Sequence, residues 1–450
     1  MALEVIILAA GKGTRMHSNT PKVLHHVAGK PLLKHVIDTA AGLGAERIHV
    51  IYGHEGQQVQ EALASENINW IEQAEQRGTG HAALQALPFL NTENDALILY
   101  ADVPLLSIKS LQQMIELGQD AALVLLTARL VNSFGLGRII TNEGSIVGIV
   151  EEKDATNEQK KINEINSGVM FTKVKHLQTW LPNLSSNNAQ SELYLTDIVG
   201  FAVNASLRVD KYLVVDPMEV QGVNDLIQLE AVERVAQLKV VEDLMRKGLT
   251  VRDKRRVDVR GKLKCGMNVT VDVNVIFEGF VTLEAGVSVG ANCIIRNSTI
   301  KQGAVIHANS MIDSSVVGIE AQVGPFARLR PGCELDEKSK VGNFVEMKKT
   351  SLGYGTKVSH LSYIGDATVG KRVNVGAGTI TCNYDGVNKH KTIIEDGVFI
   401  GSGTQLVAPI QVGINATIGA GTTLRKKAAA DALTLSRSEQ ITITSWTRKK

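Results

Sequence analysis

The sequence predicts two folds in one chain: an α/β domain in the first half and an all-β parallel solenoid in the second. From residue 1 to about 222, β-rich runs alternate with helical patterns, as a parallel sheet with crossover helices requires. After residue 250, an apolar residue returns every six positions instead. At 450 residues the chain exceeds what one hydrophobic core usually supports, which also favours two domains.

Short apolar patterns define the first elements of the α/β half. Val5-Ile6-Ile7 predicts a buried strand, and residues 48–52 and 96–100 predict two more. Pro31 is expected to open a helix, because proline is favoured at the first helical turn. The apolar face of that helix comprises Leu32, Leu33, Val36, Ile37 and Ala40.

Glycines and cations meet directly after the first predicted strand. Residues 8–16 read Leu-Ala-Ala-Gly-Lys-Gly-Thr-Arg-Met, in which Gly11 and Gly13 allow the backbone to approach an anionic group closely. Exposed N–H groups can cradle phosphate oxygens there, while Lys12 and Arg15 add positive charge. The spacing fits neither the Walker loop nor the dinucleotide fingerprint, and a structural turn is the alternative. We interpret the segment as a loop for a nucleotide phosphate.

Two further side chains extend this candidate site. Pro21-Lys22 supplies another cation on a restrained backbone, although an ordinary surface lysine is the alternative. Asp102 follows the strand at 96–100, and ligands of open α/β sheets bind outside the carboxyl ends of strands. Its carboxylate suits Mg²⁺, and capping the helix after Pro104 is the competing role.

The second half repeats with a period of six residues, which predicts a parallel β-helix. The apolar positions are Val323, Leu329, Leu335, Val341 and Met347 in one phase, and Ile400, Leu406, Val412, Ile418 and Leu424 in another. Each unit is too short to bury its own apolar residue, so successive units must stack around a continuous aliphatic column. The period breaks at residues 381–391, where polar and turn residues predict an extruded loop.

A connecting helix is predicted between the two halves. Apolar residues recur at helical spacing from Asp225 to Lys247 without glycine or proline. We therefore expect domains at residues 1–224 and 251–450, with the connecting helix and linker at 225–250.

Composition favours a soluble cytoplasmic protein. Hydrophobic residues make up 44% of the chain and charged residues 21%, and the net charge of +2 offers no bulk attraction to nucleic acid or anionic lipid. The first apolar run is short and contains Glu4, unlike a signal peptide, and no run approaches a membrane span. The cysteines are too widely spaced for a zinc site or a disulfide framework: Cys265, Cys293, Cys333 and Cys382.

Several motifs together resemble one bacterial enzyme family. They are residues 8–16, 73–82, 101–104, 222–224, 328–332, 343–349, 360–366 and 374–385. Over residues 1 to about 440, the chain resembles bifunctional N-acetylglucosamine-1-phosphate uridyltransferases and glucosamine-1-phosphate N-acetyltransferases. The resemblance implies a Rossmann-like nucleotidyltransferase domain followed by a left-handed parallel β-helix of hexapeptide repeats. It also implies a homotrimer with acetyl-transfer sites shared between subunits.

The same resemblance implies two consecutive reactions. The second domain is expected to acetylate glucosamine-1-phosphate with acetyl-CoA, and the first to couple the resulting N-acetylglucosamine-1-phosphate to UTP. The products are UDP-N-acetylglucosamine and pyrophosphate, and Mg²⁺ is the expected cofactor. No nucleic-acid or membrane partner is expected.

Uridyl transfer mainly requires crowded anions to be neutralised and aligned. Arg15 and Lys22 are the expected catalytic cations, and Asp102 is an expected Mg²⁺ ligand. Asn224 is assigned as the second Mg²⁺ ligand by resemblance alone, since such an asparagine is more often a helix cap. The resemblance assigns the other nucleotide and sugar contacts to Leu8, Gly11, Gly13, Gln73, Gly78, Thr79, Tyr100, Gly137, Glu151 and Asn166.

Two local departures from the family pattern concern the sugar pocket. Ala101 stands where the family usually has glycine, and residues 134–137, Phe-Gly-Leu-Gly, lack the more usual aromatic residue between the glycines. Neither departure removes a charged group.

Acetyl transfer to an amine requires a general base, and histidine is the natural base near neutral pH. His360 matches the base of the family, although a lone histidine is usually structural. Lys348 and Lys349 have a solvated charged turn as their alternative. The resemblance assigns the sugar-phosphate and acetyl contacts to Arg330, Lys348, Tyr363, Asn374, Asn383 and Tyr384. It assigns the acetyl-CoA contacts to Ala377, Ser402, Ala420 and Arg437.

Two other functions fit part of the pattern. A monofunctional sugar nucleotidyltransferase could use its β-helix only to oligomerise, as the ADP-glucose enzymes do, but His360, Lys348 and the loop at 383–384 argue against it. A translation-initiation exchange-factor subunit combines similar domains without catalysis. That function predicts decay of the phosphate loop, whereas Gly11, Gly13 and their neighbouring cations are present.

Overall fold

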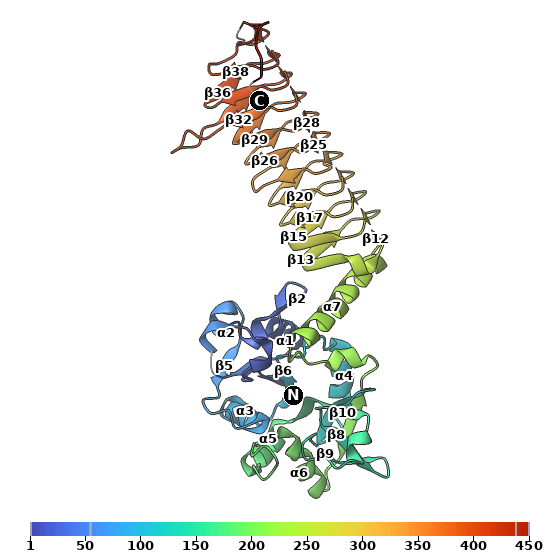
Figure 1. The fold of residues 1–450 in the computed structure, drawn as a ribbon. Coiled ribbons are helices and arrows are strands. Elements are labelled where there is room, and N and C mark those ends of the chain that lie inside the picture. Colours follow the sequence, from blue (N-terminus) through green and yellow to red (C-terminus); the bar gives the residue numbers. More distant parts are fainter. Residues whose placement is uncertain (1, 54–55, 437–438, 449–450) are drawn as a thin grey trace. The chain divides into compact units, whose positions relative to one another are not determined.

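The computed structural model describes residues 2–53, 56–436 and 439–448, and the chain divides into two compact units, Met1–Ala236 and Gln237–Lys450 (Figure 1). The division falls inside helix α7 (Leu226–Arg246), which confirms the helix predicted there. Val232 and Ala236 pack in the first unit, whereas Val241 belongs to the core of the second. The helix is therefore anchored in both hydrophobic cores.

A nine-stranded sheet forms the centre of the first unit, with its main path in the order β11-β7-β10-β6-β1-β4-β5. Its strands are β1 (Leu3–Leu8), β4 (Arg47–Tyr52), β5 (Asn69–Glu72), β6 (Asp95–Tyr100), β7 (Leu123–Arg129), β8 (Arg138–Asn142), β9 (Ser145–Val150), β10 (Glu164–Lys173) and β11 (Val209–Leu213). The three strands predicted near residues 5, 50 and 98 are β1, β4 and β6. They lie side by side and parallel.

The expectation of an all-parallel sheet is wrong for β10. This strand runs antiparallel to both β6 and β7. The chain passes from β7 through the β8–β9 hairpin to β10 with no α-helix in between, so no crossover restores the strand direction. The sheet is mixed.

Helices cover both faces of this sheet. Helices α1 (Leu32–Gly42), α2 (Gly56–Ala62) and α4 (Ile108–Leu117) contribute to the hydrophobic cluster on one face. Helices α3 (Thr79–Ala86), α5 (Val174–Trp180) and α6 (Ile198–Asn204) contribute to the cluster on the other. The buried residues of α1 are the five predicted for its apolar face. This three-layer packing buries the sheet, and leaves the carboxyl ends of β1 and β6 facing a cavity.

The second unit is a β-helix whose short parallel strands stack coil upon coil, as Figure 1 shows. One face is an 11-stranded sheet: β12 (Thr250–Val251), β14 (Thr270–Val271), β16 (Ser288–Val289), β19 (Val305–Ile306), β22 (Gln322–Val323), β25 (Lys340–Asn343), β28 (Lys357–His360), β31 (Asn374–Val375), β34 (Phe399–Ile400), β37 (Thr417–Ile418) and β39 (Leu433–Thr434).

The other faces form a continuous 17-stranded sheet. One row consists of β13 (Val257–Cys265), β15 (Val275–Leu283), β17 (Ile294–Arg296), β20 (Met311–Asp313), β23 (Arg328–Leu329), β26 (Glu346–Lys348), β29 (Tyr363–Gly365), β32 (Ile380–Cys382), β35 (Gln405–Val407) and β38 (Thr423–Leu424). The other row consists of β18 (Thr299–Ile300), β21 (Val316–Val317), β24 (Glu334–Leu335), β27 (Ser351–Leu352), β30 (Ala367–Val369), β33 (Thr392–Ile394) and β36 (Ile410–Val412).

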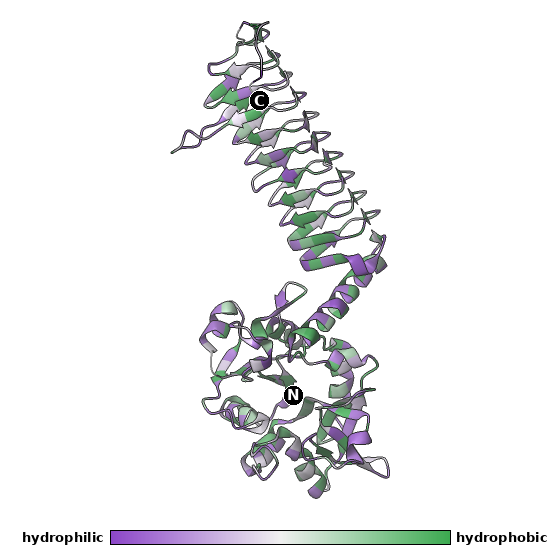
Figure 2. Ribbon diagram, in the orientation of Figure 1, coloured by the Kyte–Doolittle hydropathy of each residue, from purple (hydrophilic) through white to green (hydrophobic). Residues whose placement is uncertain are grey.

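The predicted six-residue period corresponds to one strand and one corner. Every apolar residue predicted for the column is buried, from Val323 to Leu424. Neighbouring coils pair residues such as Val341 and Val358, so the apolar side chains stack along the axis. Figure 2 shows hydrophobic residues recurring in every coil.

The predicted extruded loop is also present. Between β32 and β33 the pairing jumps from Ala367 to Thr392, because residues 383–391 leave the coil and form an arm (Figure 1). Tyr384 and Lys389 form an isolated antiparallel bridge within it.

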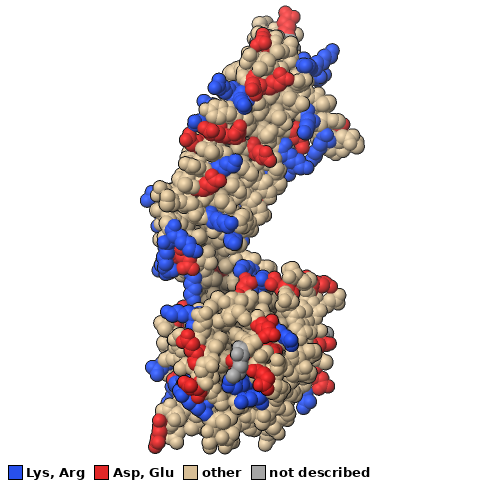
Figure 3. Space-filling view, turned by 180° about the vertical axis from the view of Figure 1, so that it is seen from behind, with Lys and Arg blue, Asp and Glu red and all other residues tan. Residues whose placement is uncertain are grey.

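Charged groups of both signs lie on the surface (Figure 3), and the thiols are unpaired. Lys/Arg and Asp/Glu side chains are interspersed on the face shown in Figure 3. All four cysteines are free. Among the described residues, no helix is both long and apolar enough to cross a bilayer.

Candidate functional sites

The segment after β1 turns sharply at Gly13, where φ is +60°. A Cβ at this position would lie 2.7 Å from the Cβ of Lys22, so a side chain would be both strained and crowded. A short 3₁₀ turn, Thr14–Met16, follows and carries Arg15. The Gln76 amide donates to the carbonyl oxygen of Ala10 at 2.6 Å and fixes the start of the loop.

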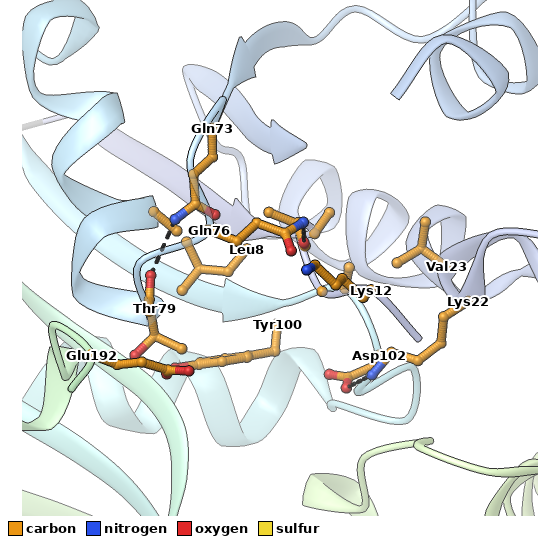
Figure 4. Close-up of a pocket in the computed structure, with 16 residues that line it drawn as sticks. Leu8, Lys12, Lys22, Val23, Gln73, Gln76, Thr79, Tyr100, Asp102 and Glu192 are labelled. Carbon is orange, nitrogen blue, oxygen red and sulfur yellow. Dashed lines mark hydrogen bonds and ion pairs between the residues drawn. The ribbon is translucent and has the colours of Figure 1, made fainter. Parts of the chain in front are cut away.

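Two oxygen ligands and two cations converge beside this loop. Lys22 Nζ lies 2.5 Å from Asp102 Oδ2 and 3.3 Å from Asn224 Oδ1. Arg15 Nη2 donates to the same Asn224 oxygen at 3.0 Å. Figure 4 shows Lys22 and Asp102 facing each other at one end of the cavity. The four residues come from segments up to 209 positions apart in sequence.

The capping roles considered for two of these residues are wrong. Helix α4 is capped by Ser107, because the Ser107 side-chain oxygen accepts from the Ser110 N–H. Asp102 therefore has no part in that cap. Asp225 accepts from the Gln228 N–H at the start of α7, whereas the Asn224 side chain points to the cations. Both residues therefore have side chains available for a ligand.

A first cavity of about 420 Å³ extends from this cluster along the carboxyl edge of β1 and β6. Its lining includes Leu8, Gly11, Lys22, Gln73, Gly78, Thr79, Tyr100 and Asp102. Gln73 Nε2 donates to the Gly78 carbonyl at 3.2 Å and also contacts His81 Nδ1. Gly78 has a φ of +106°, and a Cβ there would lie 2.7 Å from the Leu193 carbonyl oxygen. In Figure 4, Gln73 and Thr79 lie at the end opposite Lys22.

A second cavity of about 380 Å³ shares Tyr100 and Asp102 with the first. Its lining also includes Asn166, Phe134, Leu136, Gly222 and Asn224. The shared residues place the cation cluster where both cavities meet, so a ligand in each could contact the same site.

Gly137 and Glu151 lie close to each other, although neither is among the residues lining these two cavities. A Cβ on Gly137 would lie 3.3 Å from both carboxylate oxygens of Glu151. Thr196 Oγ1 donates to Glu151 at 3.1 Å, and burial raises the pKa of Glu151. Burial, together with the charges of Glu151 and Asp102, also raises the pKa of Tyr100, which remains a neutral phenol.

His360 ends β28 and is exposed to solvent. Its Nδ1 lies 2.7 Å from Oδ1 of Asn343, the residue that it pairs with on the preceding coil. In the neutral imidazole, a proton on Nδ1 that is donated to this amide oxygen leaves Nε2 with a free lone pair. The geometry suits a base.

A polar cluster surrounds Lys348 on the face formed by β23, β26 and β29. Arg330 Nη1 donates to Glu346 at 3.0 Å, and Asn383 Nδ2 donates to Asp366 at 2.5 Å. The ammonium of Lys389 lowers the pKa of Lys348 through their close approach. Lys348 therefore lies at the end of β26 with a second cation from the arm close by, and Lys349 is exposed at the turn that follows.

Tyr363 lies across this cluster. A Cβ at Gly365 would collide with the Tyr363 hydroxyl and would lie 2.9 Å from Asn383 Nδ2, so the glycine makes room for both. Asn374 lies on β31 in register with Lys357, and Tyr384 is 60% exposed on the arm.

The positions expected to bind acetyl-CoA stack at one corner of the solenoid. The Ala377 carbonyl accepts from Gly403 N–H at 2.7 Å, and the Ser402 carbonyl accepts from Gly421 N–H at 2.8 Å. Ala420 occupies the corresponding corner of the next coil, before Gly421. Arg437 lies outside the described residues.

Several residues of these sites escaped the sequence analysis. Gln76, Asn343 and Asp366 lie within motifs quoted above but were given no role. Lys389 belongs to the predicted loop, which was the only signal pointing to it. Pairing between coils, which sequence spacing alone does not reveal, brings Asn343 beside His360.

Comparison with known proteins agrees with this architecture. Residues 5–132 match the MobA-like NTP transferase domain, and residues 391–426 match the hexapeptide repeat of succinyl-transferase. The chain is 51% identical to the "Bifunctional protein GlmU" of Marinobacter nauticus, over 100% of this chain and 99% of that protein. It is 53% identical to the protein of the same name from Legionella pneumophila strain Lens, over 100% and 98%. A UDP-glucose pyrophosphorylase structure with UDP-glucose has a TM-score of 0.44 and 18% identity, over 53% of this chain and 100% of that one.

The fold and its sites define a nucleotidyltransferase joined to a left-handed β-helix of the hexapeptide acyltransferase class. The chain belongs to the GlmU family of bifunctional proteins. It is an enzyme that acetylates glucosamine-1-phosphate with acetyl-CoA and couples the resulting N-acetylglucosamine-1-phosphate to UTP.

Proposed function

We propose that Arg15, Lys22, Asp102 and Asn224 form the uridyl-transfer centre of the first unit. The observation that carries this assignment is their convergence within hydrogen-bonding distance where the two cavities meet. In this assignment, UTP occupies the first cavity, with Gln73, Gly78 and Thr79 at the uracil end and Gly11 and Gly13 at the phosphates. N-acetylglucosamine-1-phosphate occupies the second, beside Asn166, Gly137 and Glu151.

The residues present fit Mg²⁺. Asp102 and Asn224 both direct an oxygen at the Lys22 ammonium, so a positive charge is already stabilised between them. These two residues would hold the metal, which supplies charge neutralisation at the reacting phosphates.

The chain's own cations then align the reactants. Lys22 and Arg15 both contact the Asn224 side-chain oxygen, and from there their charges would neutralise the triphosphate. A phosphate oxygen of the sugar attacks the α-phosphorus of UTP, and the bond to pyrophosphate breaks. Tyr100 stays neutral and adds no negative charge between the two cavities.

In the second unit, His360 is assigned as the general base. Asn343 holds its Nδ1–H, so Nε2 can take a proton from the amine as nitrogen forms its bond to the acetyl carbon. The carbon–sulfur bond breaks and CoA leaves as thiolate. The small residues Ala377, Ser402 and Ala420 leave space for acetyl-CoA along the corner, and Arg437 is the remaining predicted contact.

Arg330 and Lys348 are assigned to the phosphate of glucosamine-1-phosphate, with Tyr363, Asn374, Asn383 and Tyr384 as the remaining contacts. Lys389 is added as a third cation, because its repulsion of Lys348 is relieved when an anion binds between them.

A homotrimer is supported by one corner of the β-helix. In early coils this corner holds Asn274, Asn292 and Asn309 in the left-handed conformation, linked by side-chain hydrogen bonds. In later coils the same corner holds Phe326, Phe344 and Leu361 at positive φ and largely exposed. Bulky apolar residues rarely adopt this conformation, and a contact with another subunit gives a reason for their exposure.

Product analysis tests the assignment of the two activities. Purified protein is mixed with glucosamine-1-phosphate, acetyl-CoA, UTP and Mg²⁺, and products are separated by anion-exchange chromatography. UDP-N-acetylglucosamine should form in the complete mixture, and N-acetylglucosamine-1-phosphate should accumulate when UTP or Mg²⁺ is omitted. Failure of acetylation or of uridylation in the complete mixture would contradict the assignment of the corresponding unit.

A further inference from the structure

Arg138, at the start of β8, is one of the largest fully buried side chains of the molecule. Only 2% of it is exposed, although it carries a full charge. Its Nη2 donates to Glu152 Oε2 at 2.6 Å, and its Nη1 donates to the carbonyl of Leu136. Removing such a charge from water costs free energy, so a buried arginine at this position needs a structural or functional explanation.

Glu152 completes a bridge to the same segment. Its Oε2 also accepts from the N–H of Gly135 at 3.1 Å. The hydrogen bond from Arg138 lowers the pKa of Glu152, so the carboxylate remains ionised at neutral pH. Arg138 and Glu152 thus hold the segment at the N–H of Gly135 and the carbonyl of Leu136.

That segment forms a wall of the second cavity. Phe134 and Leu136 line it, yet Phe134 is 79% exposed, so hydrophobic packing does little to hold the wall in place. The Gly137 carbonyl accepts from Asn166 N–H at 2.8 Å, which ties the end of the segment to β10. Within the segment, the Phe134 N–H donates to Asn132 Oδ1 at 3.1 Å and the Leu136 N–H to the Ser133 carbonyl at 3.3 Å, so Arg138 and Glu152 add side-chain contacts to a local turn.

The pair is poorly arranged for stability alone. Arg138 Nε is buried and has no hydrogen-bond partner in the described part of the chain. A buried charge whose hydrogen bonds are incomplete contributes less to the stability of the folded protein than an apolar side chain of the same size. Its value must lie in the geometry that it imposes.

We infer that Arg138 and Glu152 are positioning residues that set the wall formed by residues 134–136, and with it the affinity for the sugar phosphate. Neither side chain lines the second cavity, so both act through the backbone of the wall. The inference rests on the proposed assignment of the second cavity to N-acetylglucosamine-1-phosphate.

Steady-state kinetics of the full-length protein test this role. Glu152→Gln removes the charge but keeps the size, and Arg138→Lys keeps the charge but cannot reach both the carbonyl and the carboxylate. Glu158→Gln is the matched control, since Glu158 forms an exposed ion pair with Lys161 in the same unit. For each protein, kcat and KM are measured for N-acetylglucosamine-1-phosphate and for UTP, with acetyl transfer and thermal melting as folding controls.

We expect the KM for the sugar phosphate to rise about tenfold in Glu152→Gln and Arg138→Lys, as loss of a charged hydrogen bond allows. The kcat and the KM for UTP should not change, because the wall contributes uniform binding of the sugar. The double variant should resemble the single variants, because both changes release the same segment. The control should behave as the parent.

An unchanged KM for the sugar phosphate in folded Glu152→Gln would overturn the inference, even if Arg138→Lys fails to fold. A parallel loss of affinity for UTP would also overturn it, because it would indicate a general distortion of the unit. Failure of the cavity assignment is distinguishable from both outcomes, since Asn166→Ala, a change in the lining of the same cavity, would then also leave the KM for the sugar phosphate unchanged.

Discussion

At the scale of single residues, Asp102 combines two properties that a metal ligand needs. Its carboxylate is partly exposed, and the only cation that neutralises it in the described structure, Lys22, is on a neighbouring loop. A ligand can therefore displace Lys22 without breaking the fold. The residue lies two positions beyond β6, at the edge where both cavities open.

Asp102→Asn should reduce uridyl transfer by on the order of 10²-fold, because the amide keeps the shape but removes the charge that we propose for binding Mg²⁺. Rates are measured across a Mg²⁺ titration, in which half-saturation should move to higher concentration. Acetyl transfer should be unaffected. Asp120→Asn, at an exposed turn, serves as the control. Equal loss of both activities would instead indicate misfolding.

His360→Ala should lower the acetyl-transfer rate by on the order of 10²- to 10⁴-fold, the range typical of a positioned general base. His360 is exposed, so the thermal stability of the protein should hardly change. Uridyl transfer is measured on the same sample and His307→Ala is the control. A stable variant that retains its acetylation rate and pH dependence would exclude His360 as the base.

Asn343→Asp should shift the pH dependence of acetyl transfer. A carboxylate in place of this amide would add negative charge beside His360 Nδ1 and favour the protonated ring over the neutral base. Since the base must be neutral, the acidic limb of the kcat/KM profile should move to higher pH. A profile identical to that of the parent would mean that Asn343 does not control the protonation of His360.

At the scale of elements, the turn after β1 contains two glycines with different structural demands. Gly13 has positive φ and touches Lys22, whereas a Cβ at Gly11 would meet no atom within 4 Å. A side chain at Gly13 would therefore disturb the folded chain, whereas a side chain at Gly11 would affect only a ligand bound there.

Gly13→Ala should destabilise the first unit by about 1–2 kcal/mol, the cost of a left-handed conformation, and should displace Lys22. Gly11→Ala should leave stability unchanged and raise the KM for UTP, because only a bound phosphate would meet its methyl group. Urea unfolding and uridyl-transfer kinetics measure the two effects. If Gly11→Ala has no effect on the KM for UTP, the loop does not close on the phosphate.

At the scale of the whole molecule, the second unit exposes an apolar corner beside its proposed base. Phe326 and Phe344 stack with ring centroids 5.3 Å apart, and Leu361 follows His360 directly. An interface at this corner would cover the apolar residues and bring another subunit to the acetyl-transfer site.

Sedimentation equilibrium should give a mass near three chains. Phe344→Glu should shift the protein toward monomers, because a carboxylate in an apolar interface loses its hydration. Acetyl transfer should fall with the trimer fraction, while uridyl transfer in the same sample should persist. An active monomer would exclude acetyl-transfer sites shared between subunits.

Much of the fold follows from local patterns in the sequence. The run Val5-Ile6-Ile7, the apolar face that starts at Leu32 and the six-residue period through Val341 each correspond to the element they predicted. Such patterns are reliable because side-chain direction repeats with the backbone itself. The turn at Gly13 follows the buried strand as the glycine pattern suggests, whereas contact with a phosphate stays a prediction.

Only the tertiary structure decided which distant residues meet. Lys22 contacts Asp102 and Asn224 across 80 and 202 positions, and the reversed direction of β10 has no periodic signal. The Asn343–His360 pair likewise depends on strand register, and the Arg138–Glu152 pair depends on hairpin pairing. The physical reason is that periodicity specifies which face of an element is buried, whereas strand order and register depend on packing over the whole unit.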